Sequence, residues 1–331
     1  FAEITLIKLL HEQVTGETDR SNEISELQEK LFDYYDPVLF YAALAQKMEQ
    51  IESKKVPSNL EVPQALLLDR LDQICAERTE AIQLEEPTER TLEVVGEWLN
   101  DQYGDILDMI DKSDVEAFDA HAIALYMYRA IQTTPYLRDN DWRVEIIARE
   151  KNAISVYADD RLVCIPEQRV VGKEKLKQLV IHEVLGHALR SGVAEATGNI
   201  EGVSGTATYQ RFEESFLIVL EQCLVKKFDP QRGIDAYVAV GLAVTAGMPR
   251  DEIARTLLIT KRLEGKTMAE AVIATQGTLG RIFAGMTDVD KGVAHRKDID
   301  YLYGRNQSWR LLNYMVEHDC VDETMRWLMS A

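Results

Sequence analysis

The sequence feature that constrains this chain most is residues 181–187, Ile-His-Glu-Val-Leu-Gly-His. Two histidines with a glutamate directly after the first are what a zinc hydrolase needs, namely imidazole ligands and a carboxylate base beside the metal. The familiar spacing is His-Glu-x-x-His, which places both histidines on one face of an α-helix. Here His182 and His187 are five residues apart. On a regular α-helix they would lie about 140° apart around the axis, too far to bind one ion.

A single π-helical turn would remove this conflict, because i→i+5 hydrogen bonding brings His182 and His187 nearly into line. Gly186 is a poor helix former directly before His187, so we expect the distortion there. The alternative is a surface helix that carries these residues by chance. With only six histidines in 331 residues, we regard that alternative as the weaker one.

A third metal ligand is available on the next predicted helix, residues 208–228, which carries apolar residues at helical spacing. Glu214 and Glu221 are seven residues apart and share a face of this helix, whereas Glu213 is turned about 100° away from Glu214. Two histidines and one carboxylate would leave a fourth zinc position open for water. Spacing alone does not choose between Glu214 and Glu221.

The motif continues with Leu189-Arg190, and in this form it resembles the family of microtubule-associated tyrosine carboxypeptidases and their bacterial relatives. Residues 205–217 are similar to that family's second block, in a register that places the family's metal-binding glutamate on Glu214. Residues 297–304 are similar to a third block, Lys-Asp-x-x-Tyr-Leu-x-Gly. A weaker similarity falls on Arg281, Phe283 and Gly285. The resemblance covers about residues 150–315 in the family's order.

The chain departs from the family's pattern around the metal positions. The family's Gly-Thr before the second histidine is Leu185-Gly186, its Asn-Gly is Val193-Ala194, and its Gly-Leu-Ala is the bulkier 215–217. Every metal position is kept, so the resemblance bears more directly on metal binding than on the choice of substrate.

The resemblance implies a zinc-dependent carboxypeptidase. Zn²⁺ would be bound by His182, His187 and Glu214, and Glu183 would be the general base for the attacking water. The substrate would be a peptide or protein C-terminus ending in an aromatic, tyrosine-like residue. The candidate substrate-binding residues are Lys297, Tyr301, Arg281, Arg190 and Tyr209. For each cation among them, a structural ion pair is the competing interpretation.

Two other functions stay open. One is a zinc endopeptidase or aminopeptidase of different specificity, and the other is a non-catalytic zinc-bearing protein that holds a peptide. Glu183 argues against the second, because a pure binding protein does not need that base. The sequence does not identify the physiological substrate or the oligomeric state.

Composition favours a cytoplasmic globular protein. The four cysteines form no Cys-x-x-Cys pair, which suits a reducing compartment, and the longest apolar run, residues 236–248, is too short to span a bilayer. The net charge of −19 is concentrated in residues 1–150, where 32 acidic and 14 basic side chains give −18. This distribution disfavours nucleic acid or an anionic membrane as a partner.

The predicted architecture is α+β, mostly helical and zincin-like, with a small β-sheet and an N-terminal helical region. Strands are expected at residues 143–147, 153–158 and 161–166, where the helical period is replaced by alternation. One final helix is expected from Trp309 to Leu328. We therefore predict two domains, an acidic helical region over residues 1–135 and a catalytic domain over residues 136–331.

Overall fold

The chain forms two compact units, each discontinuous in sequence. The computed structural model describes residues 9, 23, 26, 27, 35–76, 83–149, 152–199, 203, 207–284, 294 and 299–330. Unit 1 comprises Phe1–Leu84 and Pro230–Tyr303, and unit 2 comprises Glu85–Asp229 and Gly304–Ala331. The boundary that the sequence predicts at residue 136 falls inside unit 2, so the compact units follow a different division. Within the described residues, no helix combines the length and apolarity needed to cross a membrane.

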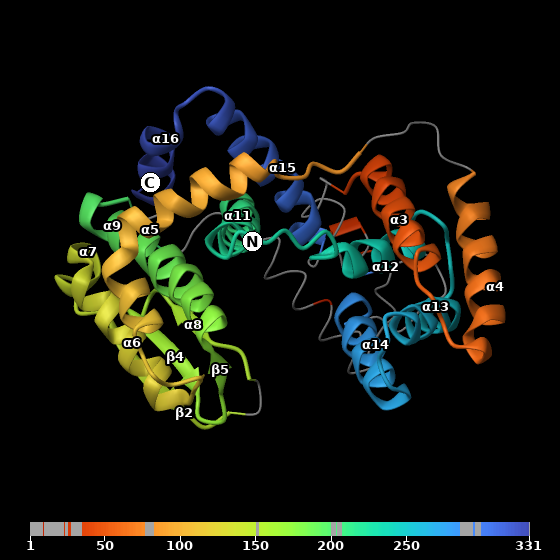
Figure 1. The fold of residues 1–331 in the computed structure, drawn as a ribbon, viewed down its shortest axis with the longest axis horizontal. Helices are drawn as coiled ribbons and strands as arrows, with labels where there is room; N and C mark the ends of the chain where they lie inside the picture. The colour runs from red at the N-terminus through yellow and green to blue at the C-terminus, as the bar shows by residue number, and fades with distance from the viewer. Residues whose placement is uncertain are drawn as a thin grey trace. The chain divides into compact units, whose positions relative to one another are not determined.

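Helices are the only regular elements among the described residues of unit 1 (Figure 1). Its helices are α3 (Pro37–Glu52), α4 (Ser58–Cys75), α12 (Ile234–Val244), α13 (Arg250–Leu263), α14 (Met268–Ile282) and the first residues of α15 (Asp300–Glu317). Local signals begin several of them: Asp36 caps α3 and accepts from the Val38 amide, and Thr267 forms a capping box with Glu270. One apolar core joins α3 and α4 to the helices that follow residue 230.

A cluster of two buried lysines and two half-buried carboxylates also links distant segments of unit 1. Lys47 Nζ lies 2.7 Å from Asp235 Oδ1 and 2.6 Å from Glu264 Oε1. Lys261 contacts the same two carboxylates, so charges of both signs balance in the interior. Burial would raise the pKa of Asp235, but the two lysines outweigh that effect and lower it. The cluster therefore ties α3 to α12 and α13 without leaving an uncompensated buried charge.

Unit 2 combines helices with two small sheets, which confirms the mostly helical α+β class. Its helices are α5 (Glu89–Asp111), α6 (Ala120–Thr133), α7 (Pro135–Arg138), α8 (Lys173–Leu179), the π-helix η1 (Val180–Ala188), α9 (Leu189–Thr197), α11 (Ala207–Leu224), the remainder of α15, and α16 (Val321–Ser330). Its strands are β1 (Ala117–Phe118), β2 (Arg143–Ile147), β3 (Ser155–Tyr157), β4 (Leu162–Pro166) and β5 (Val171–Gly172).

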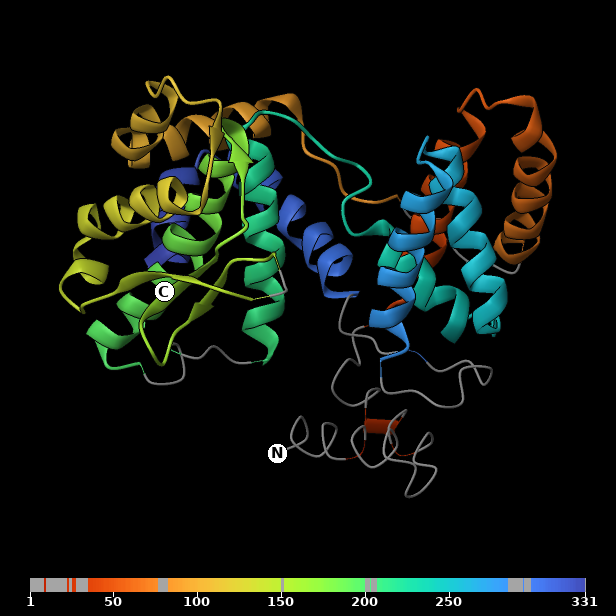
Figure 2. The same ribbon diagram turned by 90° about the horizontal axis from the view of Figure 1, so that it is seen from below.

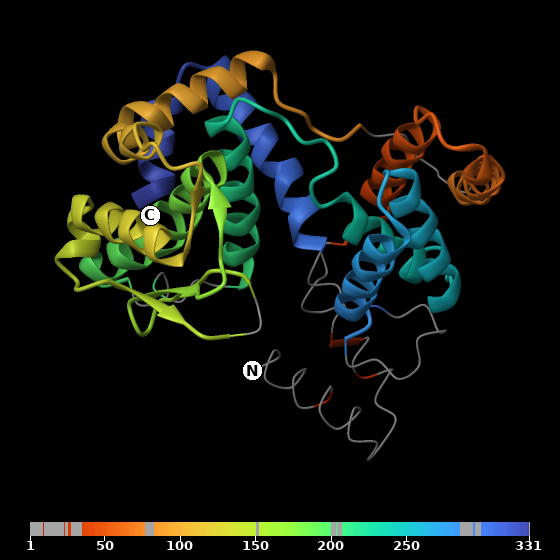
Figure 3. The ribbon, with the colours of Figure 1, turned by 60° about the horizontal axis from the view of Figure 1, so that its bottom comes forward.

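The three predicted strands are confirmed and form one sheet in the order β2-β4-β3. β2 and β4 are parallel, with Val144 opposite Val163, whereas β3 and β4 are antiparallel and joined by a turn at residues 158–161. Figures 2 and 3 show this sheet at the side of unit 2, with helices packed along it. β3 is an edge strand, and both β3 and β4 contact η1.

α5 is kinked at Tyr103, where its backbone leaves helical geometry (φ −124°). One predicted helix differs from the structure. The single helix expected from Trp309 to Leu328 is wrong, because two helices, α15 and α16, occupy this region. They are separated near Asp319, whose φ of 52° is left-handed and cannot continue a right-handed helix.

α5 and α11 pack against each other at very short range, which fixes α11 in unit 2. A Cβ atom added at Gly96 of α5 would lie 2.4 Å from the backbone oxygen of Cys223 on α11. The surrounding core includes Leu99, Val219 and Leu220, each fully buried. Only a residue without a side chain therefore permits this approach of the two helices.

Gly96→Ala should destabilise unit 2 by about 1–3 kcal/mol, because the added methyl group meets a backbone carbonyl that cannot rotate away. Denaturant unfolding of the full chain would measure the change. Gly104→Ala on the same helix is the matched control, since nothing lies within 4 Å of its added Cβ. A stability change at Gly96 no larger than that at Gly104 would contradict the short α5–α11 approach.

Candidate metal centre

The two motif histidines lie on a π-helix, as the five-residue spacing predicts. η1 runs from Val180 to Ala188, between α8 and α9. The π geometry extends over nine residues, so it is longer than the single turn expected. It places the rings of His182 and His187 side by side, with centroids 5.0 Å apart. The opposite side of η1 is packed into the core through apolar side chains, which holds the histidines in place.

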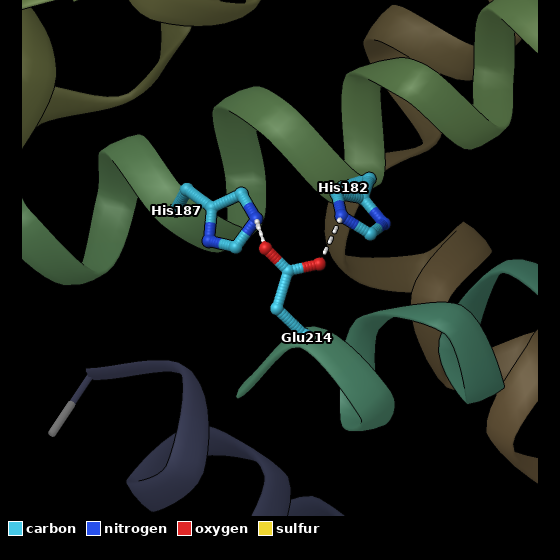
Figure 4. A group of neighbouring side chains, drawn as sticks. All are labelled: His182, His187 and Glu214. Carbon is cyan, nitrogen blue, oxygen red and sulfur yellow. Dashed lines mark ion pairs between the residues drawn. The ribbon is translucent and has the colours of Figure 1, made fainter. Parts of the chain in front are cut away.

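Glu214 of α11 faces both histidines (Figure 4). Its Oε2 atom lies 3.7 Å from His182 Nε2, and its Oε1 atom lies 3.5 Å from His187 Nε2. One potential ligand atom from each of the three residues lies within 4.8 Å of the others. The histidine side chains are largely buried, whereas that of Glu214 is 41% exposed, so the group is open to solvent on one side. These three residues could hold a metal ion and leave it a position for water.

The second nitrogen of His187 faces a buried carboxylate behind the site. His187 Nδ1 lies 3.2 Å from Glu213 Oε2, and Arg190 Nε donates to Glu213 Oε1 at 2.6 Å. Burial would raise the pKa of Glu213, but His187 and Arg190 outweigh it and lower that pKa. Glu213 therefore stays ionised between the His187 ring and the Arg190 guanidinium.

His182 has a matching arrangement. Its Nδ1 atom lies 2.7 Å from Glu221 Oε1, although its N–H direction is not in line with that oxygen, and Lys175 Nζ donates to Glu221 Oε2 at 3.0 Å. Burial would lower the pKa of His182, but Glu214 and Glu221 outweigh it and raise that pKa to about 10. Since only the neutral ring can bind a metal, metal binding must compete with this proton.

The donor set fits a divalent transition metal. Two Nε2 atoms and one carboxylate converge, and each ring has its other nitrogen beside a second carboxylate, as is usual for metal-bound histidine. Spacing left open the choice between Glu214 and Glu221, and Glu214 is the one that lies with both histidines in a group that could hold a metal ion.

Gly186 serves the close approach of η1 and α11. A Cβ atom at this position would lie 2.5 Å from both methyl carbons of Leu217, which is buried on α11 three residues after Glu214. The sequence predicts Gly186 as the site of the helical distortion. The structure adds a packing reason, because a side chain here would press against the helix that carries Glu214.

The remaining predicted residues fall into three groups. Glu183 is half-buried on η1 directly after His182, and Arg190 is buried against Glu213. Tyr209 lies on α11 before Glu214, but its side chain is outside the described part of the chain, as is all of Lys297.

Arg281 and Tyr301 belong to unit 1, Arg281 as an exposed residue of α14 and Tyr301 on α15. The substrate roles of all these residues stay predictions.

Sequence reasoning did not anticipate the roles of Glu213, Glu221 and Lys175 beside the histidines. The available signal is three glutamates on one predicted helix, where the helical spacing turns Glu213 about 100° away from Glu214. That angle is what allows it to reach the far side of a ring whose Nε2 atom faces Glu214.

No protein-family model, curated protein or solved structure shows significant similarity to this chain. The resemblance to the tyrosine carboxypeptidases therefore rests on the motifs, and the membership that it implies stays a prediction.

Gly186→Ala should weaken metal uptake and destabilise the protein by about 1–3 kcal/mol, because Leu217 is packed in the core, so its side chain must leave its rotamer or α11 must shift to admit the methyl group. Metal titration and denaturant unfolding would measure the two effects. Gly277→Ala on α14 is the control, since nothing lies within 4 Å of its added Cβ. Unchanged metal affinity in Gly186→Ala would show that the glycine does not set the distance between η1 and α11.

Proposed function

We propose that the protein is a zinc-dependent peptidase that removes an aromatic residue from a peptide or protein C-terminus. The observation that carries the proposal is the convergence of His182 Nε2, His187 Nε2 and the Glu214 carboxylate in a group open to solvent. Two histidines and one glutamate form a donor set typical of catalytic zinc. Zinc in such a site supplies Lewis acidity that activates water near neutral pH.

Glu183 is the residue that we assign to proton transfer. Its carboxylate has no hydrogen-bond or ion-pair partner among the described residues, so it is available to accept a proton from the attacking water. It would then pass that proton to the leaving amine, a contribution usually worth about 10²–10⁴-fold in rate. A protein that only bound the metal would not need a carboxylate directly after His182.

The C-terminal specificity rests on the resemblance and is the finer part of the proposal. A carboxypeptidase must bind the free carboxylate of its substrate with a fixed cation, and Lys297 is our first choice. Arg190 is less suited, because its guanidinium already donates to Glu213 and to the Val203 carbonyl. An aromatic substrate side chain would suit a pocket lined by aromatic residues of α11, where the half-buried Phe212 stacks on Phe216 with ring centroids 5.1 Å apart.

A zinc endopeptidase is the second candidate, and the edge strand β3 supports it. β3 ends the sheet and contacts η1, and an extended peptide could add to such an edge with its chain continuing in both directions. Endopeptidase and carboxypeptidase action share the metal centre and Glu183. They differ in whether a free C-terminus is required.

Purified protein should bind about one zinc per chain, as measured by elemental analysis after dialysis. Glu214→Ala should lose most of this zinc, because a ligand is removed and the effect should exceed the roughly 10–100-fold loss that follows removal of an outer partner. Glu195→Ala removes an acidic residue of α9 that pairs with Arg161 and is the control. Full zinc content in Glu214→Ala would exclude this residue as a ligand.

Peptides ending in Tyr or Phe should lose that one residue when the C-terminus is free and stay intact when it is amidated. Glu183→Gln should retain zinc and fold but lower the rate at least about 10²-fold, because the proton acceptor is removed. Mass spectrometry of the products would measure both. Internal cuts, or equal cleavage of the amides, would favour the endopeptidase, and an unchanged rate in Glu183→Gln would remove Glu183 from its role.

A further inference from the structure

Two buried glutamates on α11 lie behind the candidate metal ligands, each between a histidine and a cation. Glu213 has a side chain only 7% exposed, with one oxygen 3.2 Å from His187 Nδ1 and the other 2.6 Å from Arg190 Nε. Arg190 is itself buried and comes from α9, immediately after η1. Glu213 therefore bridges a ligand and a fixed cation entirely within the protein.

The second bridge starts from the other end of η1. Glu221 has a side chain 8% exposed, with one oxygen 2.7 Å from His182 Nδ1 and the other 3.0 Å from Lys175 Nζ. Lys175 comes from α8, immediately before η1, and is partly exposed. The two cations thus flank the π-helix on either side in sequence, while the two carboxylates come from one helix, α11.

This arrangement has a direct consequence for the histidine rings. A carboxylate beside Nδ1 keeps a proton on that nitrogen, so Nε2 is the nitrogen whose lone pair can serve a bound ion. A buried carboxylate without a cation would be costly and could turn toward the metal as a competing ligand. Arg190 and Lys175 oppose both outcomes, because each holds the oxygen that does not face the ring.

We propose that Glu213 and Glu221 are positioning residues of the metal centre and that Arg190 and Lys175 are their obligatory counter-cations. The proposal deepens the function proposed above and rests on metal binding at His182. It assigns Arg190 to the metal centre and leaves the cation for a substrate carboxylate to another residue.

Arg190 has a second contact that the test must separate from the first. Its Nη1 atom donates to the Val203 carbonyl at 3.0 Å, and the Ser191 hydroxyl donates to the same oxygen at 3.0 Å. Ser191→Ala removes the hydroxyl's own donation to this carbonyl and its donation to the His187 carbonyl at 3.1 Å, and leaves Arg190 on Glu213. It therefore serves as the control for backbone anchoring without loss of the bridge.

The test measures the zinc dissociation constant of the full chain by competition with a chromophoric chelator. Glu213→Gln and Glu221→Gln should each weaken zinc binding about 10–100-fold. Both should also shift the visible absorption of the cobalt-substituted protein, because ligand orientation changes while the ligands remain. Glu195→Gln, the same substitution in the pair with Arg161, and Ser191→Ala should stay within about twofold of the parent chain.

The role of the cations is tested through melting temperatures without metal. Arg190→Met should lower the melting temperature by leaving Glu213 uncompensated, and adding Glu213→Gln should recover part of it because the buried charge is removed. Lys175→Met and Lys175→Met with Glu221→Gln form the second pair. Lys177 lies on the same helix but pairs with Asp111. Adding Glu221→Gln to Lys177→Met should therefore not raise the melting temperature.

Parental zinc affinity and an unchanged cobalt spectrum in both glutamine variants would overturn the proposal, as would equal losses in Glu195→Gln. Absence of recovery in both double variants would remove the counter-cation role. If Glu213→Gln alone does not fold, Glu221→Gln and the Arg190→Met, Glu213→Gln double variant decide the result. A parent chain that binds no zinc would instead sink the proposed function itself, before any variant is compared.

Discussion

The site depends on the π-helical winding of η1, because no other regular helix brings His182 and His187 to one side. Such winding is less favourable than α-helix, so neighbouring structure must hold it. α8 and α9 continue it at both ends, and its apolar residues are buried in the core of unit 2. Contact with α11 through Gly186 then fixes which side of η1 faces Glu214. The distance from imidazole to carboxylate is thus set by packing that begins as far away as Gly96.

Opposite charges compensate the buried glutamates around the two histidines. Three glutamates on α11 lie within reach of two histidines, and three buried or half-buried negative charges would strongly disfavour folding without compensation. Lys175 and Arg190 supply two positive charges, and the imidazole rings supply donors. Each ring has both nitrogens beside a carboxylate, although the buried His182 Nδ1 makes no hydrogen bond in line with Glu221.

Much of this site could be predicted from local sequence. The five-residue spacing indicates π winding and the alternation after residue 143 indicates the strands, and the structure bears out both. The next predicted helix offers Glu214, and the structure places it where it could share a metal ion with both histidines. Each of these features follows from residues that are close together in the sequence. The pairing of Lys175 with Glu221 joins residues 46 apart, and periodicity carries no information about contacts at that separation. The break between α15 and α16 was missed because it depends on one left-handed residue, Asp319, which the apolar pattern does not reveal.

The interleaving of the two units has a consequence for synthesis of the protein. Unit 2 includes residues 85–229 and 304–331, and its core contains Trp309, Leu312 and Met315 of α15. At a synthesis rate of about 5–20 residues per second, some 5–20 s pass between the appearance of Asp229 and that of the last helix. During this time η1 and α11 exist without the helix that completes their core. Unit 1 is synthesised completely once Tyr303 has been added, whereas unit 2 also includes residues 304–331. The unit that carries the candidate metal site is therefore the later of the two to be completed.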